Sequence, residues 1–243
     1  MNSSDDDNEY KKLVMVLCHD LNNSIGIIKN SIKLIRKMGE HPHSKFPPTM
    51  DKIERAIDNV NELVTSIKDY EAIKNGKKEF ELEDVPFDDI INHTMFMFQD
   101  KAEEKDIKLI FINEIPSETF LKIEPTSFKN SVISNLLSNA IKFTPRDKSI
   151  EIKGWVDGDQ IMISVKDQGI GIPQELIDKM FNPNEKTTRD GTGGEKGTGF
   201  GMPLVKLYLN KFNGDIRVES KEKDKHPEDH GTTMVLNLPI VKE

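Results

Sequence analysis

The residues best suited to do chemistry in this 243-residue chain are two asparagines and a lysine on one predicted helix. Asn135 and Asn139 are four residues apart, so their side chains lie one turn apart on the same helix face, and Lys142 follows three residues later. Amide oxygens can ligate a hard cation, and an ammonium group can bind phosphate. This spacing indicates a site for a phosphorylated ligand and its cation. The alternative is a surface helix whose two asparagines are only solvated.

Three glycine-containing motifs follow this helix. They are, in order, Asp167-Gln168-Gly169-Ile170-Gly171-Ile172 after a strand-like run, Gly197-Thr198-Gly199-Phe200-Gly201 at the start of a helical pattern, and Gly231-Thr232-Thr233 near the end. The helix itself carries the pattern NxxxNAxKFT, so four motifs stand in a fixed order. In this order they resemble the ATP-binding domain of sensor histidine kinases. That domain belongs to the superfamily shared with heat-shock and mismatch-repair ATPases and type II topoisomerases.

The resemblance implies how the adenosine part of ATP is held. Asp167 accepts a hydrogen bond from the adenine amino group, and Thr232 helps to hold the adenine side. Gly169 and Gly171 let the backbone approach the nucleotide without a Cβ in the way. Phe143 packs near the ribose or the base.

The same resemblance implies the phosphate and metal end, with Mg²⁺ as the second cofactor. Asn139 is the main magnesium ligand, Asn135 lies beside it, and Lys142 faces phosphate oxygens. Backbone N–H groups at a helix N-terminus form a phosphate seat. They come from Gly197, Thr198, Gly199 and Gly201. Further contacts to the γ-phosphate are expected from three loop cations, Lys186, Arg189 and Lys196.

Two helical segments precede this region. Apolar residues recur every three or four positions from Tyr10 to about Met38, and again from Met50 to about residue 75. Glycine and proline residues at 39–48 separate the two segments, so they form an antiparallel hairpin. One hairpin cannot cover both apolar seams, and a homodimer through a four-helix bundle is therefore expected. A coiled-coil linker is the alternative.

A histidine on the first helix argues against a simple linker. With Leu17 at a heptad d position and Leu21 at an a position, His19 falls at f and faces solvent. The segment His19-Asp20-Leu21-Asn22-Asn23 resembles the phosphoacceptor box of histidine kinases. Ser24 stands where that family usually has a proline, which puts the family's helix bend in question.

The resemblance gives each polar residue of this box a role. His19 attacks the γ-phosphorus of ATP, and Asp20 acts as general base or orients the imidazole ring. The phosphoryl group then passes to an aspartate of a response-regulator receiver domain, which is the implied partner. Asn23 positions a water molecule for phosphatase activity against the phosphorylated regulator.

Two domains are expected: a dimerisation and histidine phosphotransfer domain at 1–76 and a catalytic ATP-binding domain at 77–243. The fold class is an N-terminal helical hairpin followed by a two-layer α/β sandwich with a mixed sheet. Residues 1–9 are polar and are expected to be frayed. Further helices are expected at 87–105, 125–143, 173–180 and 200–212. Strands are expected at 77–87, 107–113, 119–123, 149–156, 160–165, 215–220 and 233–239, and a mobile loop at 181–196.

Composition limits the other functions. The formal net charge of −8 argues against nucleic-acid binding through a basic field. No apolar run reaches the ~18 residues of a membrane span, so no membrane segment is expected in this chain. The single cysteine, Cys18, suits the reducing cytoplasm, although the resemblance allows a full-length protein that is attached to a membrane. Loop histidines such as His41 and His226 lack the partners of a transition-metal site.

Two other classes of protein compete with a kinase. ATP-hydrolysing members of the superfamily have a glutamate base where this helix has Asn135, so the group that would activate water is missing. A dimeric scaffold that binds ATP without catalysis is favoured by Ser24 and by Asn184, which stands where a second loop aromatic is common. The kinase is favoured by four intact residues, His19, Asp20, Asn139 and Asp167.

Overall fold

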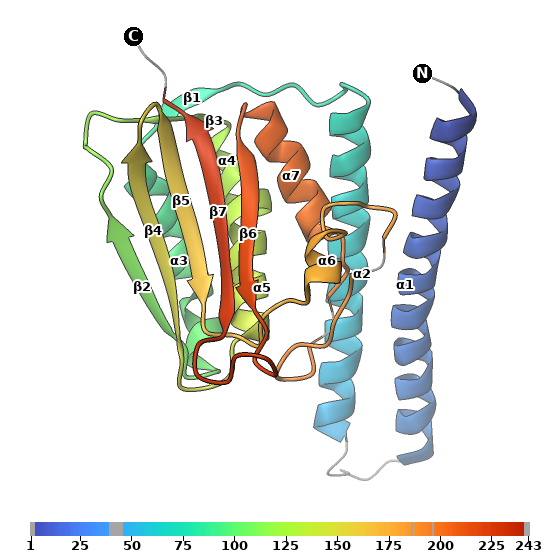
Figure 1. Cartoon of the computed structure of the whole chain (residues 1–243). Coiled ribbons are helices and arrows are strands. Elements are labelled where there is room, and N and C mark those ends of the chain that lie inside the picture. The colour runs from blue at the N-terminus through green and yellow to red at the C-terminus, as the bar shows by residue number, and fades with distance from the viewer. Residues whose placement is uncertain (1–2, 39–45, 186, 196, 241–243) are drawn as a thin grey trace.

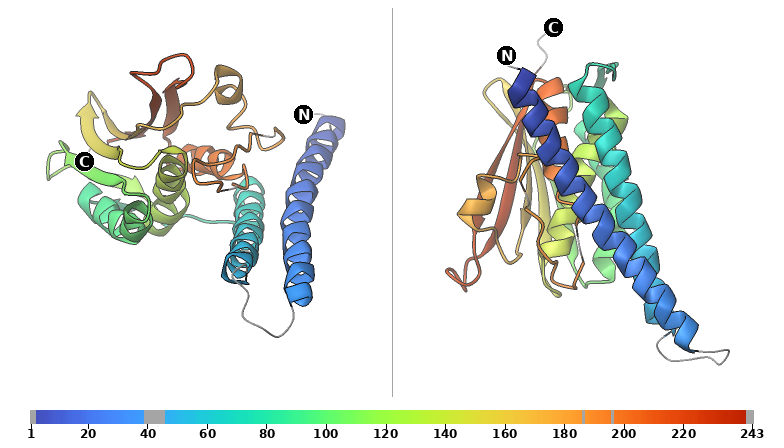
Figure 2. Two further views of the ribbon diagram at one scale, coloured as in Figure 1. Left: turned by 90° about the horizontal axis from the view of Figure 1, so that it is seen from below. Right: turned by 90° about the vertical axis from the view of Figure 1, so that its right-hand side faces the viewer.

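The computed structural model describes residues 3–38, 46–185, 187–195 and 197–240, and within the first helix it describes side chains at 17–18 and 20–37. Two long helices, α1 (Ser3–Met38) and α2 (Phe46–Lys74), stand beside a sheet whose other helices cover one face (Figure 1). The left-hand view of Figure 2 shows α2 next to the α/β part and α1 on the far side of α2. The predicted fold class, a helical hairpin followed by a two-layer sandwich, is confirmed.

Both hairpin helices begin earlier than the sequence predicts. The expectation that residues 1–9 are frayed is wrong from Ser3 onward, because α1 already begins there. α2 begins at Phe46, and the two prolines that follow are tolerated because the first turn of a helix needs no N–H donors. No helix among the described residues is long and apolar enough to cross a membrane.

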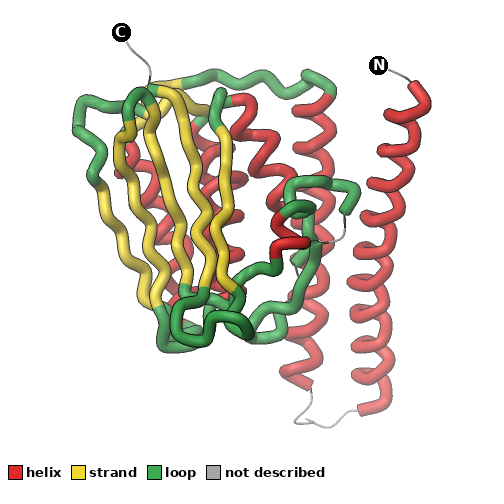
Figure 3. The backbone as a smooth tube through the Cα atoms, in the orientation of Figure 1, coloured by secondary structure: helices red, strands yellow, loops and turns green. Residues whose placement is uncertain are grey.

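The α/β part contains one five-stranded mixed sheet with the strand order β2-β4-β5-β7-β6. β2 and β4 are parallel, and the other neighbours are antiparallel. Figure 3 shows helices packed against only one face of this sheet. The five strands are β2 (Lys108–Asn113), β4 (Ser149–Asp157), β5 (Gln160–Asp167), β6 (Asp215–Lys221) and β7 (Gly231–Pro239). The helices of the layer are α3 (Phe87–Glu103), α4 (Pro125–Ser127), η1 (Phe128–Ile133), α5 (Ser134–Phe143) and α7 (Gly201–Lys211). The short helix α6 (Gln174–Ile177) lies outside this layer (Figure 1).

The asparagine helix has the predicted extent, 125–143, but not a uniform hydrogen-bond pattern. It passes from α4 through the π-helical η1 into α5, and the Ser134 N–H bonds to the Lys129 carbonyl, five residues back. A π-turn widens the helix by one residue and is common at functional sites. Apolar spacing does not predict it, because Val132 and Ile133 are buried with either pattern. The buried face of α5 packs on the sheet and leaves the asparagines at its edge.

The predicted strand at 77–87 is largely wrong. Only β1 (Glu83–Val85) is a strand, and it pairs with β3 (Leu121–Ile123) outside the main sheet. The residues that precede β1 contact helix α7 instead. The Lys78 Nζ donates hydrogen bonds to the Tyr208 hydroxyl at 2.6 Å and to Asp69 of α2 at 3.2 Å. The Phe80 ring meets the Tyr208 ring edge-on at 5.8 Å, so this segment ties α2 to α7 and does not extend the sheet.

An apolar contact joins the hairpin to the α/β part. Phe200, within the second glycine motif, clusters with Leu17 of α1 and Leu63 of α2, and its ring meets the Tyr70 ring edge-on at 5.3 Å. Farther along, the apolar seam of the hairpin is exposed in the single chain. The exposed fractions are 53% for Ile25, 41% for Ile32, 44% for Ile57 and 37% for Val64. A second hairpin would cover such a seam, as the predicted four-helix dimer requires.

Candidate nucleotide and phosphotransfer site

A cavity of about 150 Å³ lies between α5, the end of β5, the first residues of β7 and the loop that precedes α7. We call the described residues of the following loop, 181–185, 187–195 and 197–200, the lid. Twelve of the residues singled out in the sequence line this cavity: Asn135, Asn139, Lys142, Phe143, Asp167, Gly171, Arg189, Gly197, Thr198, Gly199, Gly201 and Thr232. The structure therefore brings the four sequence motifs together around one space.

Asp167 is the buried acid of the cavity, with 8% of its surface exposed. Its Oδ1 accepts hydrogen bonds from the backbone N–H of Gly169 at 2.7 Å and of Thr232 at 3.0 Å. Burial raises the pKa of Asp167 to about 6, against the opposing effects of these two hydrogen bonds and of the nearby His230. Since Oδ1 is occupied, the carboxylate can offer Oδ2 to a ligand such as the adenine amino group.

The two glycines after Asp167 are required for different reasons. A Cβ on Gly169 would lie 2.7 Å from both the Asp167 Oδ1 and the Phe143 carbonyl oxygen. Gly169 does not line the cavity, and the need for glycine there comes from its close contacts with Asp167 and Phe143. Gly171 does line it, has φ +73°, and would bring a Cβ to 2.1 Å from the Lys221 carbonyl oxygen.

The two asparagines line the cavity, and the amide nitrogen of each is bound within the protein. The Asn135 Nδ2 donates to the Ser131 carbonyl at 2.7 Å, and the Asn139 Nδ2 donates to the Met202 Sδ at 3.3 Å. With both amide nitrogens occupied, the oxygens are the groups left for a cation. Among the described residues, no group of three or more His, Cys, Asp or Glu side chains could hold a metal ion. A magnesium ion here would therefore take amide oxygens, phosphate oxygens and water, which are ligands that suit it.

Two cations flank the ring of Phe143 at the other end of the cavity. The Lys142 Nζ lies 4.8 Å and the Arg189 guanidinium carbon 5.8 Å from the ring centre. Burial lowers the pKa of Lys142, while the charges of nearby acids, above all Glu195, act in the opposite direction. Arg189 also donates to the Gly171 carbonyl at 2.8 Å, which holds this part of the lid against the first glycine motif. Both cations are placed to meet anionic oxygens.

The second glycine motif closes the cavity at the N-terminus of α7. Gly199 has φ +71°, a conformation that favours glycine. A Cβ on Gly197 would lie 2.6 Å from the Lys142 Nζ, and one on Gly201 would lie 2.3 Å from the Asn135 Oδ1. The motif is thus packed directly against the lysine and asparagine of α5, with backbone N–H groups available at a helix start.

A second, larger groove of about 250 Å³ lies between the lid and the hairpin. On the hairpin side it is lined by Asp20, Asn23, Ser24, Ile27, Asn59 and Leu63. On the lid side it is lined by Thr188, Arg189, Asp190, Gly197 and Thr198. Four lid residues, Thr188, Arg189, Gly197 and Thr198, line both spaces, so the groove adjoins the cavity.

Three predicted contacts cannot be placed. His19 lies within α1 one residue before Asp20, but its side chain is outside the described part of the chain. Lys186 and Lys196 lie outside the described residues altogether. Conversely, Glu62 of α2 lines the cavity and was not predicted. It falls in a charged helical face where nothing distinguishes it from its neighbours, and only the docking of the hairpin brings it to the site.

Comparison with known proteins agrees with this geometry. Residues 128–242 match the family described as histidine kinase-, DNA gyrase B- and HSP90-like ATPases. The autoinducer 2 sensor kinase/phosphatase LuxQ of Vibrio parahaemolyticus is 24% identical over 229 residues, which are 92% of this chain and 26% of LuxQ. The chain thus spans about a quarter of the length of that relative.

Two solved structures have the same fold. The histidine kinase AdeS of Acinetobacter baumannii has a TM-score of 0.70 at 16% identity, covering 92% of this chain and 98% of that one. The histidine kinase ThkA, in a crystal structure with the response regulator protein TrrA, has a TM-score of 0.68 at 22% identity, covering 92% of this chain and 60% of that one.

The sandwich, the buried aspartate and the ordered glycine motifs define an ATP-binding domain of the histidine kinase, gyrase and HSP90 type. Its helical hairpin, its sensor kinase relatives and its solved neighbours support a histidine kinase catalytic core.

Proposed function

We propose that this chain is an ATP-dependent protein-histidine kinase that phosphorylates itself on His19 and passes the phosphoryl group to an aspartate of a response-regulator receiver domain. One observation carries the proposal. The nucleotide cavity and the groove beside Asp20 share four lid residues, so a nucleotide phosphate in the first space has a short path to the phosphoacceptor helix.

In the nucleotide complex, the free oxygen of Asp167 accepts from the adenine amino group, while Lys142 and Arg189 bind phosphate oxygens. The amide oxygens of Asn139 and Asn135 would hold Mg²⁺, which would supply positive charge to the phosphates. The backbone N–H groups from Gly197 to Gly201 bind the remaining oxygens at the start of α7.

The transfer itself depends on position more than on covalent activation. A neutral imidazole nitrogen of His19 forms a bond to the γ-phosphorus, and the bond from that phosphorus to the bridging oxygen of ADP breaks. The imidazole proton passes to Asp20, which is the next residue of the helix and lines the groove. The products are phosphohistidine and ADP.

The groove also supports transfer within one protomer. Both of its walls, α1 and the lid, belong to the same chain, so no second subunit is needed to bring the phosphate to its acceptor. The homodimer that the exposed seam indicates would then hold two such units side by side.

The response-regulator partner and the phosphatase activity are both inferred from this groove. Asn23 lines the groove together with Asp20, which suits it to hold a water molecule against a phosphorylated receiver. This supports a phosphatase activity. A scaffold that binds ATP without catalysis remains the alternative, and it predicts ATP binding with no phosphohistidine.

The test is incubation with γ-labelled ATP and Mg²⁺. The proposal predicts a label that is lost in acid, is stable in base, and is absent from His19→Gln and from Asp167→Asn. His93→Gln, which changes an exposed histidine on α3, is the control and should label normally. An acid-stable label, or ATP binding without any label, would contradict the proposal.

A further inference from the structure

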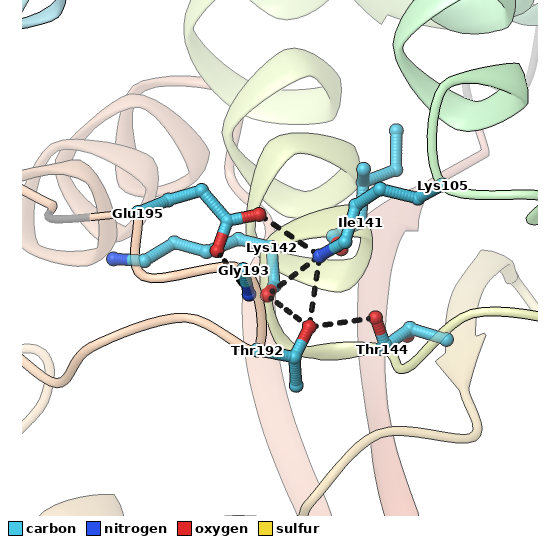
Figure 4. Close-up of polar contacts among 7 residues, drawn as sticks. All are labelled: Lys105, Ile141, Lys142, Thr144, Thr192, Gly193 and Glu195. Carbon is cyan, nitrogen blue, oxygen red and sulfur yellow. Dashed lines mark hydrogen bonds and ion pairs between the residues drawn. The ribbon is translucent and has the colours of Figure 1, made fainter. Parts of the chain in front are cut away.

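Lys105, just beyond the end of α3, is the centre of a polar cluster that no sequence motif predicts. Its Nζ lies within hydrogen-bond distance of the carbonyl oxygens of Ile141 at 2.8 Å and Lys142 at 3.2 Å (Figure 4). It also contacts the Thr192 Oγ1 at 2.8 Å and the Glu195 Oε1 at 2.9 Å. An ammonium group has three hydrogens for these four acceptors, so two of the acceptors share one hydrogen. Only 16% of the lysine side chain is exposed.

On one side, this cluster supplies hydrogen-bond donors to the C-terminal carbonyl groups of α5. The carbonyl groups of the last helical turn have no partner within the helix, and a cation there also interacts favourably with the helix dipole. Thr192 adds to the same end, because its N–H donates to the Lys142 carbonyl at 3.0 Å and its Oγ1 lies 2.9 Å from the Thr144 carbonyl oxygen. The lid is thereby attached to the helix that carries the magnesium and phosphate ligands.

On the other side, the cluster closes a turn within the lid. The Glu195 Oε2 accepts from the Gly193 N–H at 2.8 Å, and the Glu195 carbonyl accepts from the Gly191 N–H at 2.8 Å. Burial by itself would raise the pKa of the Glu195 carboxyl. The hydrogen bonds from Lys105 and from backbone N–H groups have the larger, opposite effect, so the pKa of Glu195 lies below its ordinary value. Glu195 therefore stays charged, and Lys105 holds it two residues before the phosphate-binding glycines begin.

The position of Glu195 matters because a second cation lies close by. Glu195 is the acid that acts most strongly on Lys142, the lysine expected to bind phosphate. Yet Glu195 pairs with Lys105, and no described carboxylate lies within ion-pair distance of the Lys142 Nζ. If Lys105 were absent, Glu195 could pair with Lys142 instead, and that ion pair would compete with the nucleotide for the same ammonium group.

We propose that Lys105 is a positioning residue for nucleotide binding: it clasps the lid to the end of α5 and holds Glu195 away from Lys142, which leaves Lys142 for the phosphates. This proposal takes the identity of the ligand, ATP, from the proposed function. Lys105 itself touches neither nucleotide nor acceptor.

The test measures ATP affinity of the full chain by calorimetry and does not depend on phosphorylation. Lys105→Met should weaken binding about tenfold, as expected for the loss of a charge-assisted contact. Lys105→Met combined with Glu195→Gln should recover most of this loss, because the second change removes the competitor for Lys142. Glu195→Gln alone should change affinity little. The control is Lys108→Met, which alters an exposed lysine three residues away.

A merely structural role for Lys105 would not give this recovery, so a double variant as weak as Lys105→Met overturns the proposal, as does wild-type affinity in Lys105→Met. Hydrogen exchange without nucleotide gives an independent readout. The Gly191 and Gly193 amides should exchange faster in Lys105→Met, and unchanged exchange would exclude the clasp. Loss of His19 labelling with intact ATP binding would instead count against the proposed function alone.

Discussion

Thr232 on β7 donates its backbone N–H to the Oδ1 of Asp167 at the end of β5, at 3.0 Å, across two neighbouring antiparallel strands. The Gly169 N–H binds the same oxygen. This pair of donors fixes the carboxylate so that one oxygen belongs to the protein and the other to the ligand. The arrangement predicts how the site responds to a change in charge, in pH and in hydrogen-bond capacity.

Asp167→Asn should abolish nucleotide binding and leave the fold intact. The amide oxygen of the variant would take the place of Oδ1, because both backbone donors require an acceptor. Its NH₂ group would then face the adenine amino group, donor against donor, at a cost of roughly 1–3 kcal/mol or more. Calorimetric titration with ATP measures the loss, and thermal unfolding checks the fold. Asp157→Asn, at an exposed position, is the control. Unaltered ATP affinity would exclude Asp167 as the adenine acceptor.

Adenosine binding should weaken as the pH falls through about 6, because burial raises the pKa of Asp167 to that value and the protonated acid no longer accepts a hydrogen bond. Adenosine is the probe because it has no phosphate that titrates in this range. The stability of the nucleotide-free domain should change in the opposite direction. The folded pKa lies above the ordinary value of 3.8, so this residue adds stability as the pH falls from about 6 toward 4. Chemical-shift titrations at pH 5.5 and 7.5 test the first statement, and equal affinities would contradict it.

Ile32→Asp should convert the dimer into a monomer. Ile32 is 41% exposed in the single chain and lies in the apolar seam of α1, so a second hairpin would bury it and a carboxylate there would lose its water. Sedimentation at micromolar concentration reports the change in mass. Asn30→Asp, which adds the same charge at an exposed position of the same helix, should remain dimeric. A monomeric wild-type chain would mean that the exposed seam is not covered by a second copy.

Mixed dimers should fail to complement one another. One subunit carries His19→Gln and the other Asp167→Asn, so the working nucleotide site and the working acceptor lie on different chains. Because the groove is built from the α1 helix and the lid of one chain, no label is expected on the subunit that keeps His19. Electrophoresis of subunits with different tags distinguishes the two. Strong labelling of the Asp167→Asn subunit would show that transfer takes place between protomers.

How much of this could be read from the sequence depends on how far apart the interacting residues are. The asparagine helix, the strand ending at Asp167 and the position of the helix after Phe200 follow from local spacing, and they define most of the cavity. Lys105 and Glu195 carry no local signal, because their contact joins positions 90 residues apart. The strand predicted at 77–87 fails for a related reason, since Lys78 is held by Tyr208, 130 residues away, and alternation of apolar residues cannot reveal that.

Asn23 should separate the two proposed activities of the groove. It lies one helical turn from His19 and lines the groove, whereas in the proposed mechanism the imidazole proton passes to Asp20. Asn23→Ala should therefore keep autophosphorylation within a few-fold and slow dephosphorylation of the cognate regulator, by about 10²-fold if the water is well positioned. Asp20→Ala should do the reverse.

The assay for Asn23 is paired: incorporation of label into the kinase, and loss of label from purified phosphorylated regulator. Asn22→Ala is the matched control, since Asn22 is the exposed neighbouring amide and does not line the groove. Equal loss of autophosphorylation in Asn23→Ala and Asp20→Ala would refute the division of roles. Because Ser24, beside Asn23, replaces a proline that would restrict the helix, that result would point to a different helix geometry around the histidine.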